Sequence, residues 1–449
     1  SKISGVISNL KPRLSYGVNG NVNGIGNFDV YGAYSQVGAK TYGGSTAFYN
    51  SGLVNTGLRW EQSQSFEAGL DIGFLNNRLS FILDYYNRTT KDLLTKQALP
   101  GYTGFTEIMT NMGTLRNYGF EMEVRANILN NPKGLTWDVT ANLSSVANKI
   151  VKLPYNGNPN NRVGGYEVAT GRKKADGTDE TKWIAGRQEG GKLGELVAYK
   201  QNHIFKDWDD VKKYANNRID EVANLYGPGL AAQYAGKEGW QPIEPGDVCW
   251  EDINGDGVIN GYDRQVVGNI FPKVTGGFST TLGYKNLSLY ARFDYALGHT
   301  IYNDLAARSL GQYQGSFNII KEVKKTWSET NTDTDLPAFY YADQLSKKNI
   351  TRSNNGLTAI DNNSSRFYEK GDYLALRELT LNYNLPKTWI SKVGMTDASV
   401  YVTGQNLFYI TGYTGVSPEP AVDTTYGRGI DNGRYPTPRT VLFGLSVTF

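Results

Sequence analysis

The stretch that decides the fold is YGFEMEVRANI, residues 118–128, in which apolar and polar side chains alternate without a break. One set comprises Tyr118, Phe120, Met122, Val124, Ala126 and Ile128. Gly119, Glu121, Glu123, Arg125 and Asn127 lie between them. A β-strand points successive side chains to opposite faces, so this stretch predicts a strand with one apolar and one polar face.

The same period of two recurs along the chain. It is found in FEAGLDIGF (66–74), LTWDVTANLS (135–144), LSLYARFDYAL (287–297) and TVLFGLSVTF (440–449), the last ending on Phe449. Each alternation spans about the 9–11 residues that a tilted strand needs to cross a bilayer. We therefore expect many antiparallel strands that each carry one continuous apolar face.

Two architectures would satisfy this pattern. In a soluble sandwich the apolar face forms the core, whereas in an outer-membrane barrel it meets lipid and the polar face lines a wet lumen. The predicted connections favour the barrel, because short and long ones alternate as in outer-membrane proteins. The short ones are 75–78, 130–134 and 284–288, and the long ones are 38–56, 96–115, 153–271, 300–365 and 411–435.

Composition excludes several classes of protein. No stretch of the 449 residues approaches the roughly 18 apolar residues of a membrane-spanning helix. The net charge is +3 with scattered basic residues, which gives no nucleic-acid-binding stripe. The single cysteine, Cys249, is expected to be a small buried thiol. The chain begins SKISGVISNL, without a signal sequence, and we expect a processed protein or a piece of a longer one.

A calcium-type loop is predicted at 252–263, DINGDGVINGYD. A hard cation takes roughly six to eight oxygens, which an EF-hand loop supplies from positions 1, 3, 5, 7, 9 and 12. Here these positions are Asp252, Asn254, Asp256, the backbone carbonyl of Val258, Asn260 and Asp263. The alternative is a turn rich in Asp, Asn and Gly that holds no ion. No helices are predicted on both sides, so the loop would be a structural Ca²⁺ site and not a sensor.

Longer segments resemble one family. The similar segments include LRWEQSQSFEAGLDIGFLNNRLSFILDYYNRTTKDLL (58–94), PGDVCWEDINGDGVINGYDRQVVGNIFPKVTGGFSTTLGYKNLSL (245–289), YLALRELTLNYNLPKTWI (373–390) and GIDNGRYPTPRTVLFGLSVTF (429–449). The family that they resemble is that of the SusC/RagA-type TonB-dependent transporters. The resemblance implies an all-β fold, a transmembrane antiparallel barrel of the roughly 22-stranded class.

The resemblance also implies the domain organisation. Residues 1–449 would form the C-terminal half of the barrel, with about 11 or 12 of its strands, as a single domain. Residues 153–271, which include the calcium-type loop, and 300–365 would be long extracellular loops. The family's plug domain and N-terminal strands have no counterpart in this chain, so TonB-contact and gating residues are not assigned.

The function that the resemblance implies is TonB-dependent import of oligosaccharides or oligopeptides through the bacterial outer membrane. The implied partners are the N-terminal half of the transporter, a SusD-like lipoprotein, TonB–ExbB–ExbD, outer-membrane lipid and the substrate, with a dimer of transporter–lipoprotein pairs as the larger assembly. Alternatives are a passive porin or adhesin barrel, a soluble dockerin-like module and an outer-membrane hydrolase. Only His203 and His299 are present, neither near a nucleophile motif, so catalysis is not expected.

Two further expectations concern the loops and the lumen. Residues 207–226, DWDDVKKYANNRIDEVANLY, predict a short amphipathic helix with Asp207 as N-cap. On the polar face of the strands, carboxylates interleave with Arg125 and Arg292 to give a wet lining of mixed charge. The carboxylates are Asp71, Glu121, Glu123, Asp138 and Asp294.

Overall fold

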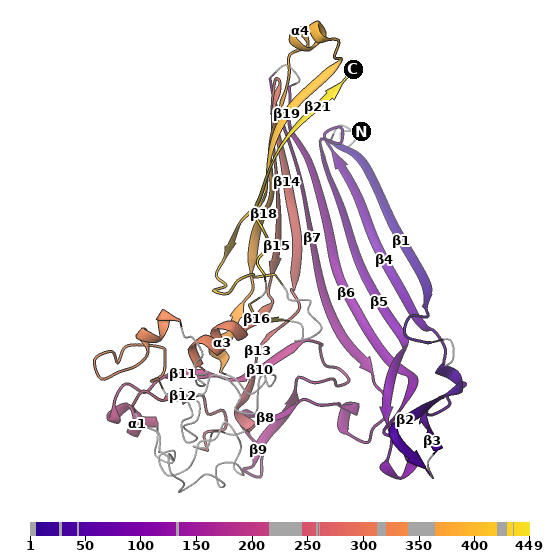
Figure 1. Cartoon of the computed structure of the whole chain (residues 1–449), viewed down its shortest axis with the longest axis vertical. Coiled ribbons are helices and arrows are strands. Elements are labelled where there is room, and N and C mark those ends of the chain that lie inside the picture. The colour runs from indigo at the N-terminus through magenta and orange to yellow at the C-terminus, as the bar shows by residue number, and fades with distance from the viewer. Residues whose placement is uncertain are drawn as a thin grey trace. The chain divides into compact units, whose positions relative to one another are not determined.

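The computed structural model describes most of the chain (Figure 1). The described residues are 6–26, 29–42, 45–131, 134–214, 245–256, 259, 261–311, 320–339, 364–419, 429–433 and 435–449. The chain divides into two compact units. The first comprises Ser1–Gly164, Gly186–Leu193 and Gly276–Ser288, and the second comprises Gly165–Ala185, Gly194–Thr275 and Leu289–Phe449.

Ten strands of the described residues make up the main sheet. The first six follow the order β1 (Ile7–Asn21), β4 (Glu61–Phe74), β5 (Leu79–Ala98), β6 (Glu107–Asn130), β7 (Leu135–Lys152) and β14 (Val274–Tyr284). The other four follow the order β15 (Leu287–Leu297), β18 (Tyr373–Asn384), β19 (Asp397–Thr411) and β21 (Thr440–Thr448). The order in the sheet is thus the order along the chain, as in an up-and-down barrel wall.

Most of the connections alternate in length as the sequence predicted, although 385–396 is longer than 99–106. On one side of the sheet they are 75–78, 131–134, 285–286 and 385–396, the last holding α4 (Lys387–Ile390) and η8 (Ser391–Val393). On the other side they are 22–60, 99–106, 153–273, 298–372 and 412–439. The connection expected at 96–115 is shorter than predicted, because β5 continues to Ala98 and β6 already begins at Glu107. A β-bulge between Thr90 and Leu93 interrupts the alternation there and hides these strand extensions.

The long connections contain small sheets of their own. Among the described residues the main sheet has ten strands, where about 11 or 12 were expected. The pairs are β2 (Ala33–Tyr42) with β3 (Ser45–Gly52), β8 (Tyr166–Lys173) with β9 (Asp179–Ile184), β10 (Glu195–Tyr199) with β13 (Arg264–Asn269), and β11 (Gln201–Ile204) with β12 (Val248–Trp250). A further sheet joins β17 (Tyr368–Lys370), β16 (Thr300–Asn303) and β20 (Ile430–Asp431).

Short helices complete the described chain. The α-helices besides α4 are α1 (Trp208–Tyr214) and α3 (Asp304–Gly311). The 3₁₀ helices besides η8 are η1 (Asp29–Tyr31), η2 (Gly101–Thr103), η3 (Pro159–Asn161), η4 (Gly261–Asp263), η5 (Lys321–Lys325) and η7 (Ser365–Phe367). The backbone N–H of Asp210 donates to Asp207 Oδ1 at 2.8 Å, which confirms the predicted N-cap of α1. The rest of the predicted helix lies outside the described residues.

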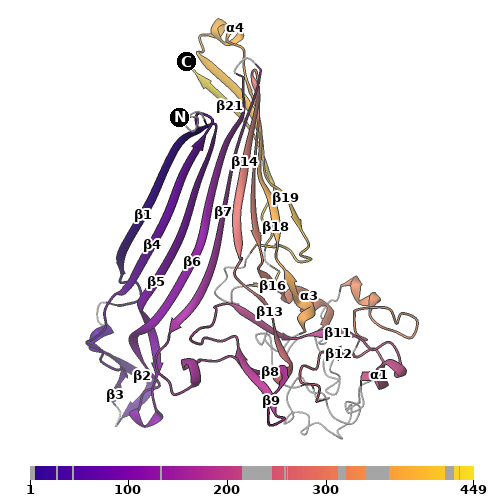
Figure 2. The ribbon, with the colours of Figure 1, turned by 180° about the vertical axis from the view of Figure 1, so that it is seen from behind.

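Registers join the apolar residues of neighbouring strands into continuous rows. Strands β1 and β4–β7, which carry them, lie side by side in Figure 2. One row runs Leu10, Ile72, Phe81, Val124 and Ala141, and the next runs Pro12, Leu70, Leu83, Met122 and Leu143. In the second unit, Leu381, Val402 and Phe443 form such a row, and Phe443 is 83% exposed. None of the residues in these rows is buried, so the rows do not form the core of a sandwich.

Candidate functional site

The calcium-type loop follows β12 in a small core of the second unit. Tyr199, Ile204, Phe205, Val211, Val248, Cys249, Trp250 and Ile259 are buried together, and Trp327 packs against them. Cys249 is therefore a buried free thiol, as expected. Backbone bonds extend this frame, because the N–H of Glu251 donates to the carbonyl of Lys200 at 2.9 Å. The core thus fixes the point at which residue 252 enters the loop.

The first half of the loop is a tight turn held by its own polar side chains. Asp252 Oδ1 accepts a hydrogen bond from the N–H of Gly255 at 2.8 Å, and Asn254 Nδ2 donates to Asp256 Oδ2 at 2.8 Å. Gly255 has a φ of +72°, a left-handed conformation that glycine adopts without strain. The turn therefore holds the side chains of Asp252, Asn254 and Asp256, which are loop positions 1, 3 and 5, close to one another.

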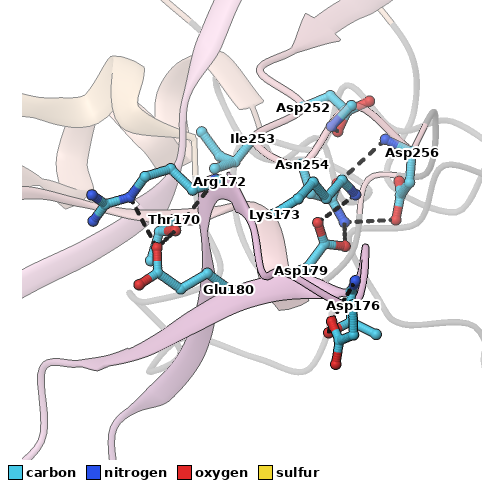
Figure 3. A network of polar contacts seen from close by, with 12 residues as sticks. Thr170, Arg172, Lys173, Asp176, Asp179, Glu180, Asp252, Ile253, Asn254 and Asp256 are labelled. Carbon is cyan, nitrogen blue, oxygen red and sulfur yellow. Dashed lines mark hydrogen bonds and ion pairs between the residues drawn. The ribbon is translucent and has the colours of Figure 1, made fainter.

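The hairpin β8–β9 supports this turn from the side (Figure 3). Asn254 Nδ2 also donates to Asp179 Oδ2 at 3.1 Å, and Lys173 Nζ lies 2.5 Å from the other oxygen of Asp179. The bond from Lys173 holds the pKa of Asp179 below its usual range. A Cβ on Gly171 would lie only 3.2 Å from the carbonyl oxygen of Ile253, so glycine allows the hairpin and the loop to approach closely.

The last predicted ligand, Asp263, lies in η4 and is fully buried. Its Oδ1 accepts a hydrogen bond from the N–H of Ile253 at 2.8 Å, which closes the loop on its own start. Asp252, Asn254, Asp256 and Asp263 are thus on one closed loop, whereas Val258 and Asn260 lie outside the described residues. Among the residues described, no three His, Cys, Asp or Glu side chains converge in a metal-binding arrangement. The geometry supplies the closed loop and the oxygen donors, and the metal stays a prediction.

The polar face of the main sheet is rich in paired charges. Arg13 Nε donates to Asp71 Oδ1 and Nη2 donates to Asp84 Oδ2, each at 2.9 Å, which ties β1 to β4 and β5. Arg125 pairs with Glu123 on the same face of β6. The polar face thus carries both signs of charge, as predicted, and Arg13 is a member that the sequence pattern did not reveal.

A second network lies at the long-connection end of β15, β18 and β19. Arg377 sits at a β-bulge of β18, and its side chain is only 14% exposed. Its Nε donates to Asp294 Oδ2 at 2.8 Å, and its Nη2 donates to Glu419 Oε1 at 2.5 Å. Tyr409 accepts from Nη1 at 3.1 Å and donates to the same oxygen of Glu419 at 2.7 Å. This network anchors the segment 413–419 against two strands of the sheet.

Further side chains fasten the same segment to its surroundings. Tyr413 donates to Asp431 Oδ2 at 2.7 Å, and burial together with this bond raises the pKa of the Tyr413 hydroxyl. The buried His299 bonds the carbonyl oxygen of Pro418 at 3.0 Å. The other histidine, His203, bonds Asp210 Oδ2 at 3.0 Å beside α1. Both histidines thus make structural hydrogen bonds.

Comparison with known proteins decides the family. The model of the TonB dependent receptor-like β-barrel family matches residues 5–294. The chain belongs to this family. The TonB-dependent receptor P3 of Formosa agariphila is 29% identical over 458 residues, covering 100% of this chain and 40% of that protein. The TonB-dependent receptor SusC of Bacteroides thetaiotaomicron is 27% identical over 454 residues, covering 99% and 38%.

Solved structures agree on the fold. The RagAB peptide transporter superimposes with a TM-score of 0.69 at 23% identity, covering 99% of this chain and 41% of the matched chain. The SusC/RagA-type resemblance predicted from the sequence is confirmed. The chain spans about 40% of the length of the curated relatives it matches.

The family also settles the location. TonB-dependent receptors of the SusC and RagA type are β-barrels of the bacterial outer membrane, and this chain is an outer-membrane barrel protein. Within the described residues, no helix is both long enough and apolar enough to span a bilayer. The family consists of transporters and receptors, which agrees with the expectation that the chain is not an enzyme.

Proposed function

We propose that the chain forms part of the barrel wall of an importer that carries oligosaccharides or oligopeptides across the outer membrane. Membership of the TonB-dependent receptor family is the observation that carries this proposal. The charged and hydrogen-bonded face of the sheet would line the substrate's path through the barrel, because the interior of such a barrel is polar and polar solutes can exchange hydrogen bonds with water for those with its side chains. Arg13, Asp71 and Asp84 would then lie beside the moving substrate.

The remaining strands, the plug and the link to TonB would come from the rest of the same transporter. In the described residues β1 and β21 each have a single neighbour in the main sheet. An unpaired strand edge in hydrocarbon costs several kcal/mol for each unsatisfied backbone group, which supports partner strands on both edges. A SusD-like lipoprotein would dock on the long connections 153–273 and 298–372.

Uptake in the host bacterium tests this function. Cells with the full-length protein and cells with the gene deleted receive fluorescent oligosaccharides and oligopeptides, with and without a protonophore. We expect uptake of at least one probe to depend on both the gene and the proton-motive force. Gene-dependent uptake that persists after the protonophore would indicate the alternative, a passive pore. No gene-dependent uptake of either probe would refute import.

We further propose that the loop 252–263 binds Ca²⁺ as a structural clamp. Asp252, Asn254, Asp256 and Asp263 have the donor chemistry that a hard cation prefers. Val258, through its carbonyl, and Asn260 would complete the set. Several carboxylates in one turn repel one another, and a bound cation would remove that repulsion. The ion would lower the entropic cost of ordering the connection 153–273, which carries the proposed docking surface for the lipoprotein.

A further inference from the structure

A groove lies at the long-connection end of β19, between this strand and the residues that lead into β21. Its volume is about 470 Å³. Two short segments of the second unit line it, namely 406–417 and 435–439. Asn406 Nδ2 donates to the carbonyl oxygen of Pro438 at 3.3 Å, which holds the second segment against β19. The groove is therefore a feature that both segments build together.

One cation of the groove has no counter-charge within the described residues. Arg439 lines the groove, is exposed, and makes neither a hydrogen bond nor an ion pair with any residue that the structure describes. In the anchoring network, Glu419 is already bound by Arg377 and by the hydroxyl of Tyr409. The guanidinium of Arg439 is thus available for an anion, which it can bind through two parallel N–H donors.

The rest of the lining combines rings with small polar groups. The polar residues are Asn406, Ser417 and Thr437. Tyr435 is 95% exposed, and Pro436 and Pro438 stand beside it. The ring of Tyr409 contributes from β19, while its hydroxyl is occupied by Glu419. Exposed aromatic and proline rings provide stacking surfaces at low entropic cost. The combination suits a ligand with a carboxylate at one point and an apolar or ring surface next to it.

We propose that this groove binds a carboxylate of the imported oligomer, so that Arg439 selects acidic substrates at the barrel mouth. The proposal rests on the import function and names the chemical class of its substrate. The same chemistry has two sources, the C-terminal carboxylate of a peptide and the uronate of an acidic oligosaccharide. Charge complementarity carries the assignment, because Arg439 is the cation of the groove and has no protein partner in the described chain.

Binding to the purified full-length protein in detergent tests this. One probe pair is tetra-alanine with a free C-terminus and its C-terminal amide. The other is trigalacturonate and its methyl ester. We expect the acid of at least one pair to bind about tenfold or more tightly than its neutral form, as the loss of a charged hydrogen bond implies. The pair that shows the preference identifies the source of the carboxylate.

Variants locate the preference. Arg439→Gln should abolish it and Arg439→Lys should keep part of it, whereas Lys392→Gln, an exposed cation in η8 on the opposite, short-connection side, should leave it unchanged. Heat-modifiable migration on gels verifies that each variant folds as a barrel. Acid and neutral probes that bind alike or not at all, or a preference that survives in Arg439→Gln, would overturn the proposal. Proton-motive-force-dependent uptake by wild-type cells is measured separately, so the import function can stand when the role of Arg439 fails.

Discussion

Replacing Arg377 by Gln should loosen the segment 413–419. The side chain makes charged hydrogen bonds to Asp294 and Glu419, and each such bond contributes about 1.5–3 kcal/mol. The side chains of these two carboxylates are 38% and 35% exposed, so water compensates part of the loss. We therefore expect the segment to open with about 2–4 kcal/mol less free energy than in the wild type.

Hydrogen exchange of the full-length protein in detergent measures this free energy. The N–H of Val416, which bonds Asp431 Oδ2 at 3.2 Å, should lose about 30-fold or more of its protection, since 1.4 kcal/mol corresponds to about tenfold. The matched control is Arg172→Gln. Arg172 pairs with Glu180 at 2.9 Å but is 77% exposed, so its loss should cost about 1 kcal/mol or less. Equal effects of the two substitutions on the protection of their own segments would refute the anchoring role of Arg377.

Three further predictions concern the metal loop, pH and the apolar rows. Amide hydrogen exchange in the loop 252–263 should be slower in 1 mM Ca²⁺ than in a chelator. The double substitution Asp252→Ala and Asp256→Ala should remove this difference. Equal exchange rates of the wild type in Ca²⁺ and in chelator would count against the ion. Because the folded-state pKa of Asp179 lies below its unfolded value, its contribution is complete above about pH 4 and is lost as the pH falls through the folded value. The amide protection factors of β8–β9, corrected for the intrinsic exchange rate, should fall as the pH drops below about 4 in the wild type and should not change with pH in Asp179→Asn. Leu83→Arg, in the middle of an apolar row, should destabilise the barrel by about 2–4 kcal/mol in a lipid-bilayer unfolding assay, whereas Glu121→Arg on the polar face should cost far less; similar losses would contradict the assignment of faces.

Local patterns made the strands predictable. The alternation at 118–128 needs only neighbouring residues, and β6 indeed covers it, with Phe120 opposite Tyr85 and Met122 opposite Leu83. The short turns at 75–78 and 131–134 follow from the points where the alternation stops. The end of β5 at Ala98 and the start of β6 at Glu107 were missed, because the bulge shifts the period and the hairpin beyond it no longer alternates regularly.

The contacts of the candidate sites were not predictable in the same way. Asp179 reaches Asn254 across 75 positions of sequence, and Arg377 reaches Asp294 across 83. Neither pair leaves a periodic signal, since only the folding of the long connections brings them together. The spacing of oxygen-bearing residues at 252–263 was visible in the local sequence. The close approach of the hairpin β8–β9 to this loop, which Gly171 allows, was not.

An outer-membrane barrel requires one face of each strand to meet lipid, and single cysteines in β6 measure this most directly. Cys249 is buried, so it provides a silent background for labelling. Cysteines that replace Phe120 and Met122 should resist a water-soluble maleimide, and a fluorophore attached to them should be quenched by a lipid-phase spin label. Cysteines that replace Glu121 and Glu123 should react with the maleimide, and a fluorophore attached to them should not be quenched. Maleimide reactivity at Phe120 and Met122, or the reverse alternation, would contradict the barrel.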